Sequence, residues 1–348
     1  MSGFRVYAAT DQRMAPSAIA AHARRAEALG YDGLNVPDSV HDGLTAATVA
    51  LGATSNLKVA TSVLVAFPRS PMAVAVAAWD LQELSGGRFE LGLGSQVRGN
   101  VVGRYSTTWT APVPRMREYV GALQAIFECW RSGGPLEFDG AHYHFKRMQP
   151  FFRPDPVDHP EVPIYLGGVK PNMVALAGET ARGLMTHPTN STPRYVKEAL
   201  LPHLARGAVR GARDVENVEL MVGPLTVTAP DEDGVRAERE RTRQLLTFLY
   251  STPAYAPSLE LFGWEDRGER LHELSREGRW DEMADVVDDE MLDTLAPTGS
   301  YDDIADILRD WYGGLTSWIT FPMPADAADD AAAAEVIAAL RSGPAALR

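Results

Sequence analysis

Residues 58–94 have the sequence KVATSVLVAFPRSPMAVAVAAWDLQELSGGRFELGLG, which contains one complete strand–helix–strand repeat. The β-branched run Lys58–Val65 predicts a strand, and Arg88–Leu93 predicts a second one. Between them, Pro71–Leu84 predicts a helix, because proline suits the first turn and Gly86-Gly87 suits the C-terminal stop. Strands that alternate with helices in this way predict an α/β fold with a parallel sheet.

The same alternation extends over nearly the whole chain. The other runs that predict strands are Phe4–Ala9, Gly33–Val36, Val162–Leu166, Gly183–His187, Val218–Val227 and Trp318–Phe321. The other runs that predict helices are Pro16–Leu29, Leu44–Ala53, Pro114–Trp130, Pro171–Thr180, Pro193–Arg210, Glu232–Leu249 and Ala331–Arg341. Eight strands, each followed by a helix, favour a (β/α)8 barrel of the TIM type over an open doubly wound sheet. We therefore expect a single barrel domain over residues 1–348.

Two stretches exceed what a minimal barrel needs, at about 133–163 and 251–296. The first contains Phe138–Phe145, which predicts a hairpin with an Asp139-Gly140 turn. The second is aromatic, helical and acidic. Because insertions that follow barrel strands lie over the catalytic face, both are candidate walls or lids of a pocket. The second insertion also fits a subunit interface.

The charge of the chain limits the partners that it can have. The 348 residues include 33 lysines and arginines and 46 aspartates and glutamates, for a net charge of −13, which argues against nucleic acid and anionic membranes. Residues 281–310 hold eleven acids and one base, so −10 of this charge lies there, and we expect a solvated helical face. Residues 88–118 and 140–153 are basic, which fits either an anionic small ligand or an ordinary surface.

Other features of the composition exclude further classes of protein. Cys129 is the one cysteine, which excludes an internal disulfide and a multi-cysteine metal site. His142 and His144 share one face of the predicted hairpin, but no third ligand is spaced near them, and we expect no metal. The sequence begins without a secretory signal pattern, and its apolar stretches are too short to span a bilayer. We expect a cytoplasmic protein.

Polar side chains at the C-terminal ends of barrel strands are catalytic candidates by position. Asp38 and His41 follow the second predicted strand, and His187 ends the sixth. The alternative for each is a structural side chain that forms hydrogen bonds within the fold.

Glycine-rich strand ends supply a second kind of candidate. Gly94-Ser95-Gln96 follows a strand, but the glycines lack the G-x-G-x-x-G spacing and no helix is expected at once, which argues against a Rossmann fingerprint. These residues fit either close approach of a ligand or a tight turn. Gly167-Gly168-Val169-Lys170 lies between a strand and a helix start. It fits either an anion site made of free backbone N–H groups or a simple βα turn.

Several blocks together resemble the bacterial luciferase-like family of flavin and deazaflavin enzymes. They are Gly30–Asp38, Thr61–Val63, Arg69–Pro71, Leu84–Gly94, Tyr165–Gly168 and Ala177–Gly183. A narrower resemblance points to a subfamily assigned to the deazaflavin coenzyme F420. Its residues are Gly94–Arg98, Pro114–Tyr119, Ser251–Tyr255 and Gly278–Met283.

The resemblance implies where a cofactor would bind. Family members hold the flavin or deazaflavin ring at the C-terminal mouth of the barrel, over a bulge with a non-proline cis peptide, which here corresponds to Ser62–Val63. The phosphate of the cofactor lies against the loop after the fifth strand. The residues expected to contact the cofactor are therefore Ser62, Val63, Gly94, Ser95, Gln96, Gly167, Gly168, Val169 and Lys170.

The resemblance also implies a reaction, namely hydride transfer between coenzyme F420 and a small organic substrate. Deazaflavin carries hydride, so the protein positions the reactants and supplies a proton. We expect His41 to be the acid or base and Asp38 its orienting or ring-contacting partner. Related deazaflavin enzymes often have an aromatic residue, an acid and then histidine at this strand. Here Asn35 precedes Asp38, and the histidine lies farther along, at His41.

Two other functions remain open. A reduced-flavin monooxygenase on the same scaffold would bind FMN, and a non-catalytic paralogue would bind a ligand without turnover. The resemblance further implies a homodimer that acts on a small molecule.

Overall fold

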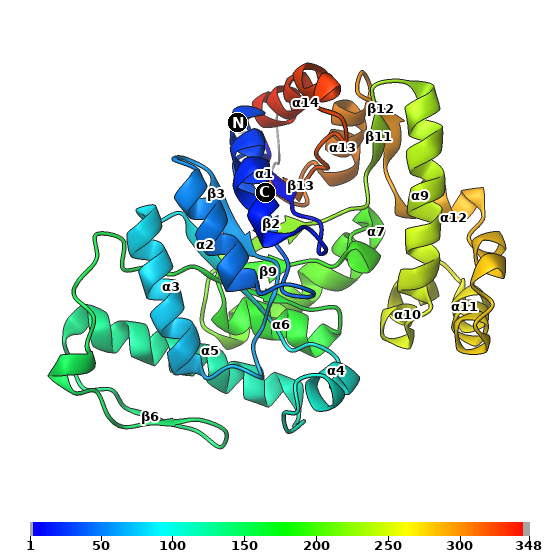
Figure 1. Cartoon of the computed structure of the whole chain (residues 1–348). Coiled ribbons are helices and arrows are strands. Elements are labelled where there is room, and N and C mark those ends of the chain that lie inside the picture. Colours follow the sequence, from blue (N-terminus) through cyan, green and yellow to red (C-terminus); the bar gives the residue numbers. More distant parts are fainter. Residues whose placement is uncertain (1–2, 344–348) are drawn as a thin grey trace.

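The computed structural model describes residues 3–343, in which eight parallel strands form a closed barrel surrounded by helices (Figure 1). The barrel strands are β1 (Arg5–Ala9), β2 (Gly33–Val36), β3 (Lys58–Thr61), β5 (Phe89–Gly94), β8 (Ile164–Gly167), β9 (Gly183–Met185), β10 (Glu219–Val222) and β13 (Trp318–Thr320). β1 pairs with both β13 and β2, and β3 pairs with β5, which closes the ring. The predicted TIM-type barrel is confirmed.

Helices cover the outside of the barrel. They include α1 (Pro16–Ala28), α2 (Gly43–Ala53), α3 (Pro71–Ser85), α5 (Pro112–Ser132), α6 (Pro171–Thr180), α8 (Leu201–Arg210), α9 (Glu232–Tyr250), α13 (Ile304–Tyr312) and α14 (Asp330–Ser342). The ends of α3 show why the helix lies where it does. Ser70 accepts a hydrogen bond from the amide of Met72, and Gly86 ends the helix with a left-handed φ of 61°.

The structure departs from the prediction at several places, two of them beside prolines. The strand expected to end at Val227 stops at Val222, because Gly223-Pro224 follows and proline cannot donate to the ladder. The segment β11 (Val227–Ala229) pairs instead with β12 (Thr298–Ser300), outside the barrel. The helix expected from Pro193 to Arg210 contains a π-helical turn at Val196–Leu200, just before Pro202, which lacks a backbone N–H. A short helix that was not predicted, α4 (Arg98–Gly103), follows β5.

The N-terminal pole of the barrel is filled by aromatic rings. Tyr7, Tyr165 and Trp318 point inward and are almost fully buried, with ring centroids 4.6 Å apart for Tyr7–Trp318 and 5.1 Å for Tyr165–Trp318. The Tyr7 hydroxyl donates to the buried carboxylate of Glu90 at 3.0 Å. Side chains therefore close the barrel at this end.

A second carboxylate, the partly buried Glu219, lies at the same pole. It accepts hydrogen bonds from the Arg5 guanidinium at 2.6 Å, the Arg182 guanidinium at 2.9 Å and the Tyr165 hydroxyl at 2.9 Å. Burial alone would raise the pKa of Glu219, but the hydrogen bonds and the charge of Arg5 outweigh it, so the pKa lies below its ordinary value. The Glu219 side chain is thus held as a carboxylate.

Both insertions form structure of their own. β6 (Phe138–Asp139) and β7 (His144–Phe145) form the predicted antiparallel hairpin. The second insertion contributes α10 (Ala256–Glu260), α11 (Glu265–Glu277) and α12 (Asp289–Leu295), which lie with α9 to one side of the barrel (Figure 1). We call α9–α12 the insertion module. Its hydrophobic core contains Val227, Leu246, Tyr250, Leu259, Trp264, Leu271, Leu274, Met283, Val287, Met291, Leu292, Leu295 and Ala296.

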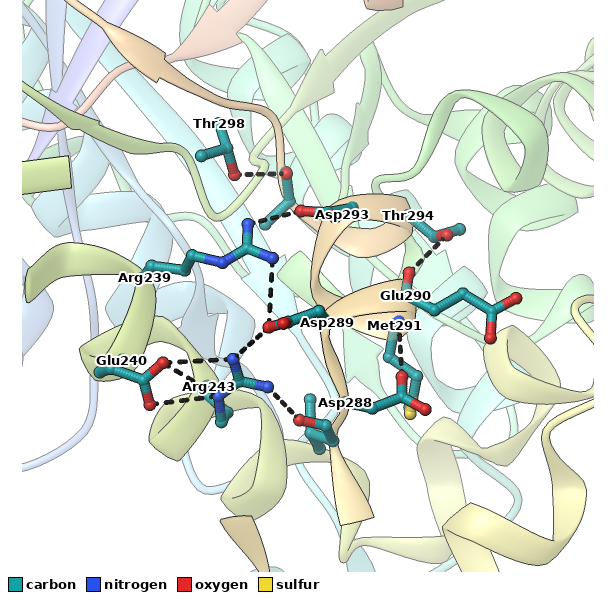
Figure 2. A network of polar contacts seen from close by, with 12 residues as sticks. Arg239, Glu240, Arg243, Asp288, Asp289, Glu290, Met291, Asp293, Thr294 and Thr298 are labelled. Carbon is teal, nitrogen blue, oxygen red and sulfur yellow. Dashed lines mark hydrogen bonds and ion pairs between the residues drawn. The ribbon is translucent and has the colours of Figure 1, made fainter. Parts of the chain in front are cut away.

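The acidic window supplies ion pairs to this module. Figure 2 shows Asp289 of α12 between two arginines of α9, Arg239 at 3.3 Å and Arg243 at 2.6 Å. Asp293 pairs with Arg239, and Asp288 pairs with Arg267 of α11 at 2.8 Å. The window lies at the surface, as expected. Much of its charge is nevertheless neutralised by arginines from helices that precede it in the sequence.

Candidate functional site

The C-terminal mouth of the barrel is built around Val63. The Ser62–Val63 peptide is cis, which confirms the prediction, and it separates β3 from the continuation strand β4 (Leu64–Val65). A Cβ atom placed on Gly94 would lie 2.5 Å from one methyl group of Val63. A Cβ atom placed on Gly167 would lie 3.0 Å from the other methyl group. The ends of β5 and β8 therefore need glycine because the Val63 side chain fills the space between them.

Small residues make the mouth shallow. Ala9 lies two residues after the inward-facing Tyr7, so it shares that face of β1, and it is exposed. Gly223 follows β10, and a Cβ atom there would have its nearest neighbour 3.5 Å away, the Thr320 hydroxyl. An open floor with few side chains suits a flat ring system.

The loop after β8 presents backbone donors beside this floor. Within residues 3–343, the amides of Gly168, Val169 and Lys170 donate to no protein acceptor, and the Lys170 side chain is exposed. The Gly168 carbonyl accepts a hydrogen bond from the Asn190 side chain at 3.2 Å, which holds the loop in place. α6 begins directly afterwards, at Pro171. Free amides, a lysine and a helix N-terminus together can hold a phosphate group.

Asp38 positions the backbone around the bulge. Its carboxylate accepts from the Arg69 guanidinium at 2.7 Å, the Val65 amide at 2.9 Å and the Gly43 amide at 3.0 Å. It does not bond to His41, so the structure corrects the expected pairing of these two residues. With its oxygens already occupied, Asp38 joins the loop after β2 to the strand that follows the cis peptide.

His41 lies in that same loop, directly before the N-cap of α2. Its side chain is partly exposed and has no hydrogen-bond partner in the part of the chain that the structure describes. The guanidinium of Arg104, at the end of α4, donates to the carbonyl of Ser39. α4 therefore covers one side of the loop, and the acid–base role of His41 stays a prediction.

Gln96 has a structural task that the sequence did not reveal. It adopts a left-handed φ of 58°, and its side-chain oxygen accepts from the Val97 amide at 2.9 Å and from Asn100 at 3.2 Å. These bonds stabilise the start of α4, a short helix that the sequence analysis did not predict. Ser95 is partly buried beside it. Contact of either residue with a cofactor stays a prediction.

His187 joins the insertion module to the mouth. It follows β9, and its ring stacks on Tyr255 with centroids 4.5 Å apart and planes 12° apart. Burial lowers the pKa of His187 to about 4, so the ring is neutral at physiological pH. The sequence indicated His187 by its position at a strand end. It gave no signal that Tyr255, from the insertion, would lie against it.

Other features bear on the choice of site. A surface groove of about 470 Å³ lies at the N-terminal pole, between α5 and residues 160–164, whereas TIM barrels place their active sites at the C-terminal mouth. Within residues 3–343, no cluster of three or more His, Cys, Asp or Glu side chains is arranged to hold a metal ion. None of the helices in this range combines the length and apolar character that crossing a bilayer requires.

Comparison with known proteins agrees with this geometry. A family model described as luciferase-like monooxygenase matches residues 2–317. The chain belongs to this family. An uncharacterised member from Mycobacterium tuberculosis is 40% identical over 303 residues, which cover 86% of this chain and 89% of the relative.

The names of two further relatives of this luciferase-like chain state a reaction. The 5,10-methylenetetrahydromethanopterin reductase of Archaeoglobus fulgidus is 28% identical over 268 residues, 74% of each chain. The solved structure of the coenzyme F420-dependent tetrahydromethanopterin reductase of Methanopyrus kandleri superposes with a TM-score of 0.78, at 19% identity, over 98% of each chain. The family resemblance seen in the sequence is confirmed, and so is the barrel.

Proposed function

We propose that this luciferase-like protein binds coenzyme F420 at the barrel mouth and transfers hydride between the cofactor and a small organic substrate. The observation that carries the proposal is the shallow floor around Val63, which adjoins three free backbone amides and an exposed lysine. A flat ring with a phosphate-bearing tail matches that pair of features. Relatives named for coenzyme F420 support the same choice.

The residues present fit the group. Val63, Gly94 and Gly167 would lie beneath the ring, and the amides of Gly168 and Val169 would bind a phosphate oxygen. When bound, the deazaflavin supplies a carbon that gives or accepts a hydride. The protein binds and orients the reactants, and we assign His41 to hold or take the proton of the substrate oxygen. Its free imidazole, on the loop after β2, suits that task.

Titration of the purified protein with coenzyme F420 and with FMN tests the proposal. We expect micromolar binding of coenzyme F420 and at least tenfold weaker binding of FMN, about 1.4 kcal/mol. Lys170→Ala should weaken coenzyme F420 binding roughly twofold to fivefold, since an exposed charge pair contributes up to about 1 kcal/mol. Lys197→Ala removes an exposed lysine of the same kind from another helical segment and should bind as the wild type does.

The same titration separates the alternatives. Preference for FMN would overturn the proposal in favour of a flavin-dependent monooxygenase, which the description of the family supports. Binding of coenzyme F420 without turnover of any substrate would favour a non-catalytic paralogue. Unchanged binding of coenzyme F420 in Lys170→Ala would show that the loop after β8 does not bind the phosphate.

A further inference from the structure

The insertion module places one tyrosine against the barrel mouth. Tyr255 ends a short 3-10 turn, Pro253–Tyr255, that follows α9. Its partner His187 lies two residues after Met185, which faces the barrel interior and is paired in register with Gly167 at the floor. Strand alternation keeps His187 on the inward side. The stacked pair therefore borders the floor where Gly167 lies.

One edge of the His187 ring is anchored to the turn that carries it. Nδ1 accepts from the backbone amide of Thr189 at 3.4 Å, as expected of a helix-capping side chain, and lies 2.9 Å from the Thr189 hydroxyl. Nε2 lies 3.4 Å from the Tyr255 hydroxyl oxygen. Because the two ring planes are only 12° apart, the in-plane N–H or lone pair of Nε2 points past this oxygen, and stacking holds the two rings together.

This arrangement leaves the hydrogen of the Tyr255 hydroxyl free. Nε2 of His187 lies in a nearly parallel plane, and within residues 3–343 no other acceptor is within hydrogen-bond distance of the Tyr255 O–H. Tyr255 is half-buried, so one side of the group remains accessible. Burial also raises the pKa of Tyr255, which keeps the phenol protonated at physiological pH.

The turn that carries His187 is held rigidly. The hydroxyl of Tyr250 donates to the carbonyl of Thr189 at 3.2 Å, and the Asn190 side chain accepts from the amide of His187 at 2.7 Å. The Ser191 hydroxyl donates to the carbonyl of Gly223, at the end of β10, at 3.1 Å. The tyrosine is therefore supported by both the barrel and the module.

We propose that Tyr255 donates a hydrogen bond to an oxygen atom of the substrate, and that His187 is the positioning residue that aims it. The substrate class that this donor selects is an alcohol or its carbonyl counterpart. The inference rests on the proposed function, because it places this oxygen beside the cofactor ring.

Tyr255→Phe tests the donor, with Tyr301→Phe as the matched control. Tyr301 is also a partly buried tyrosine but lies beyond β12, away from the mouth, and its hydroxyl has no hydrogen-bond partner among residues 3–343. The probes are small secondary alcohols assayed with coenzyme F420, and the matching ketones assayed with its reduced form. Coenzyme F420 binding is measured separately for each variant.

We expect at least one probe to react. Tyr255→Phe should lower kcat/KM for it by roughly 10- to 100-fold without changing coenzyme F420 affinity, as for the loss of one oriented donor. Tyr301→Phe should match the wild type. Equal turnover in Tyr255→Phe overturns the donor role, and a protein that binds coenzyme F420 but reacts with no probe overturns the substrate class. A protein that does not bind coenzyme F420 overturns the proposed function itself.

His187→Asn tests the positioning role. Asparagine can still accept from the Thr189 amide, as a helix cap requires, but it lacks the ring that stacks on the phenol. We expect the same loss of kcat/KM as in Tyr255→Phe, in kcat and not in coenzyme F420 affinity, with the fold retained. A His187→Asn variant as active as the wild type would overturn the role.

Discussion

The barrel and the insertion module are stabilised in different ways. In the barrel, parallel strands surround an interior in which Glu90 is buried and accepts hydrogen bonds from Tyr7 and Lys58, and the partly buried Glu219 has three partners. In the module, a smaller apolar core is combined with ion pairs at the surface, where Asp289 is 74% exposed. Exposed ion pairs contribute little and are screened by salt, whereas breaking a buried pair is costly. The stacked rings of His187 and Tyr255 join the two regions at the barrel mouth.

The first and largest expected effect concerns the barrel mouth. Gly94→Ala would place a Cβ atom 2.5 Å from a methyl group of Val63, so either the bulge or β5 must shift. We expect a loss of about 1–3 kcal/mol of stability, typical of overpacking, together with at least tenfold weaker coenzyme F420 binding. Urea unfolding and fluorescence titration measure the two effects.

Gly99→Ala is the control for that substitution. Nothing lies within 4 Å of a Cβ atom at Gly99, and the residue is in α4, where alanine is preferred to glycine. Its stability and binding should stay close to the wild type. Equal effects of the two substitutions would show that the close contact with Val63 is not the reason for glycine at position 94.

A smaller effect is expected at the N-terminal pole, and it depends on pH. Because the folded pKa of Glu219 is lower than its unfolded pKa of about 4.5, the carboxylate stabilises the fold fully above that pH. This contribution is lost as the pH falls through the folded pKa. Glu219→Gln should cost on the order of 1 kcal/mol at pH 7, and the difference from wild type should shrink as the pH falls below 4.

Stability curves at pH 7, 5 and 3 measure this prediction. Glu335→Gln, at an exposed position on α14, is the control and should follow the wild type at every pH. A constant difference between Glu219→Gln and wild type across the range would mean that the charge of Glu219 does not stabilise the folded state.

The smallest effect is expected in the module. Asp289→Asn removes the charge that pairs with Arg239 and Arg243, and these pairs keep the pKa of Asp289 below its ordinary value. The variant should lose a little thermal stability in low salt and match the wild type in about 1 M salt, where exposed pairs are screened. A loss that persists in high salt would show that the module depends on this contact more than its exposure suggests.

Local rules were enough to predict most of the fold. The boundaries of β2 and α6 matched the expectation, and proline and glycine at the ends of α3 act as the local rules require. Where Pro224 interrupted a periodic run, periodicity alone extended the strand too far, whereas the helical run through Pro202 kept its expected bounds with a π-helical turn inside them. The cis peptide at Ser62 followed from family resemblance, since no local pattern specifies it.

The candidate site was less predictable because its geometry depends on contacts distant in sequence. The sequence pointed to Gly94 and Gly167, but not to Val63 as the reason for both. Asp38 was expected to pair with His41, whereas its carboxylate accepts two hydrogen bonds from the guanidinium of Arg69. The stacking of His187 on Tyr255 joins segments 68 residues apart, and nothing near either residue signals the other.

The packed rings at the N-terminal pole have a consequence for ligand traffic. Tyr7, Tyr165 and Trp318 close the barrel at that end, so in the part of the chain that the structure describes the C-terminal mouth is its one opening. A ligand bound on the floor must therefore enter and leave through the mouth. For the two ligands of the proposed function, this geometry predicts an order of binding in which the ligand on the floor arrives first and leaves last.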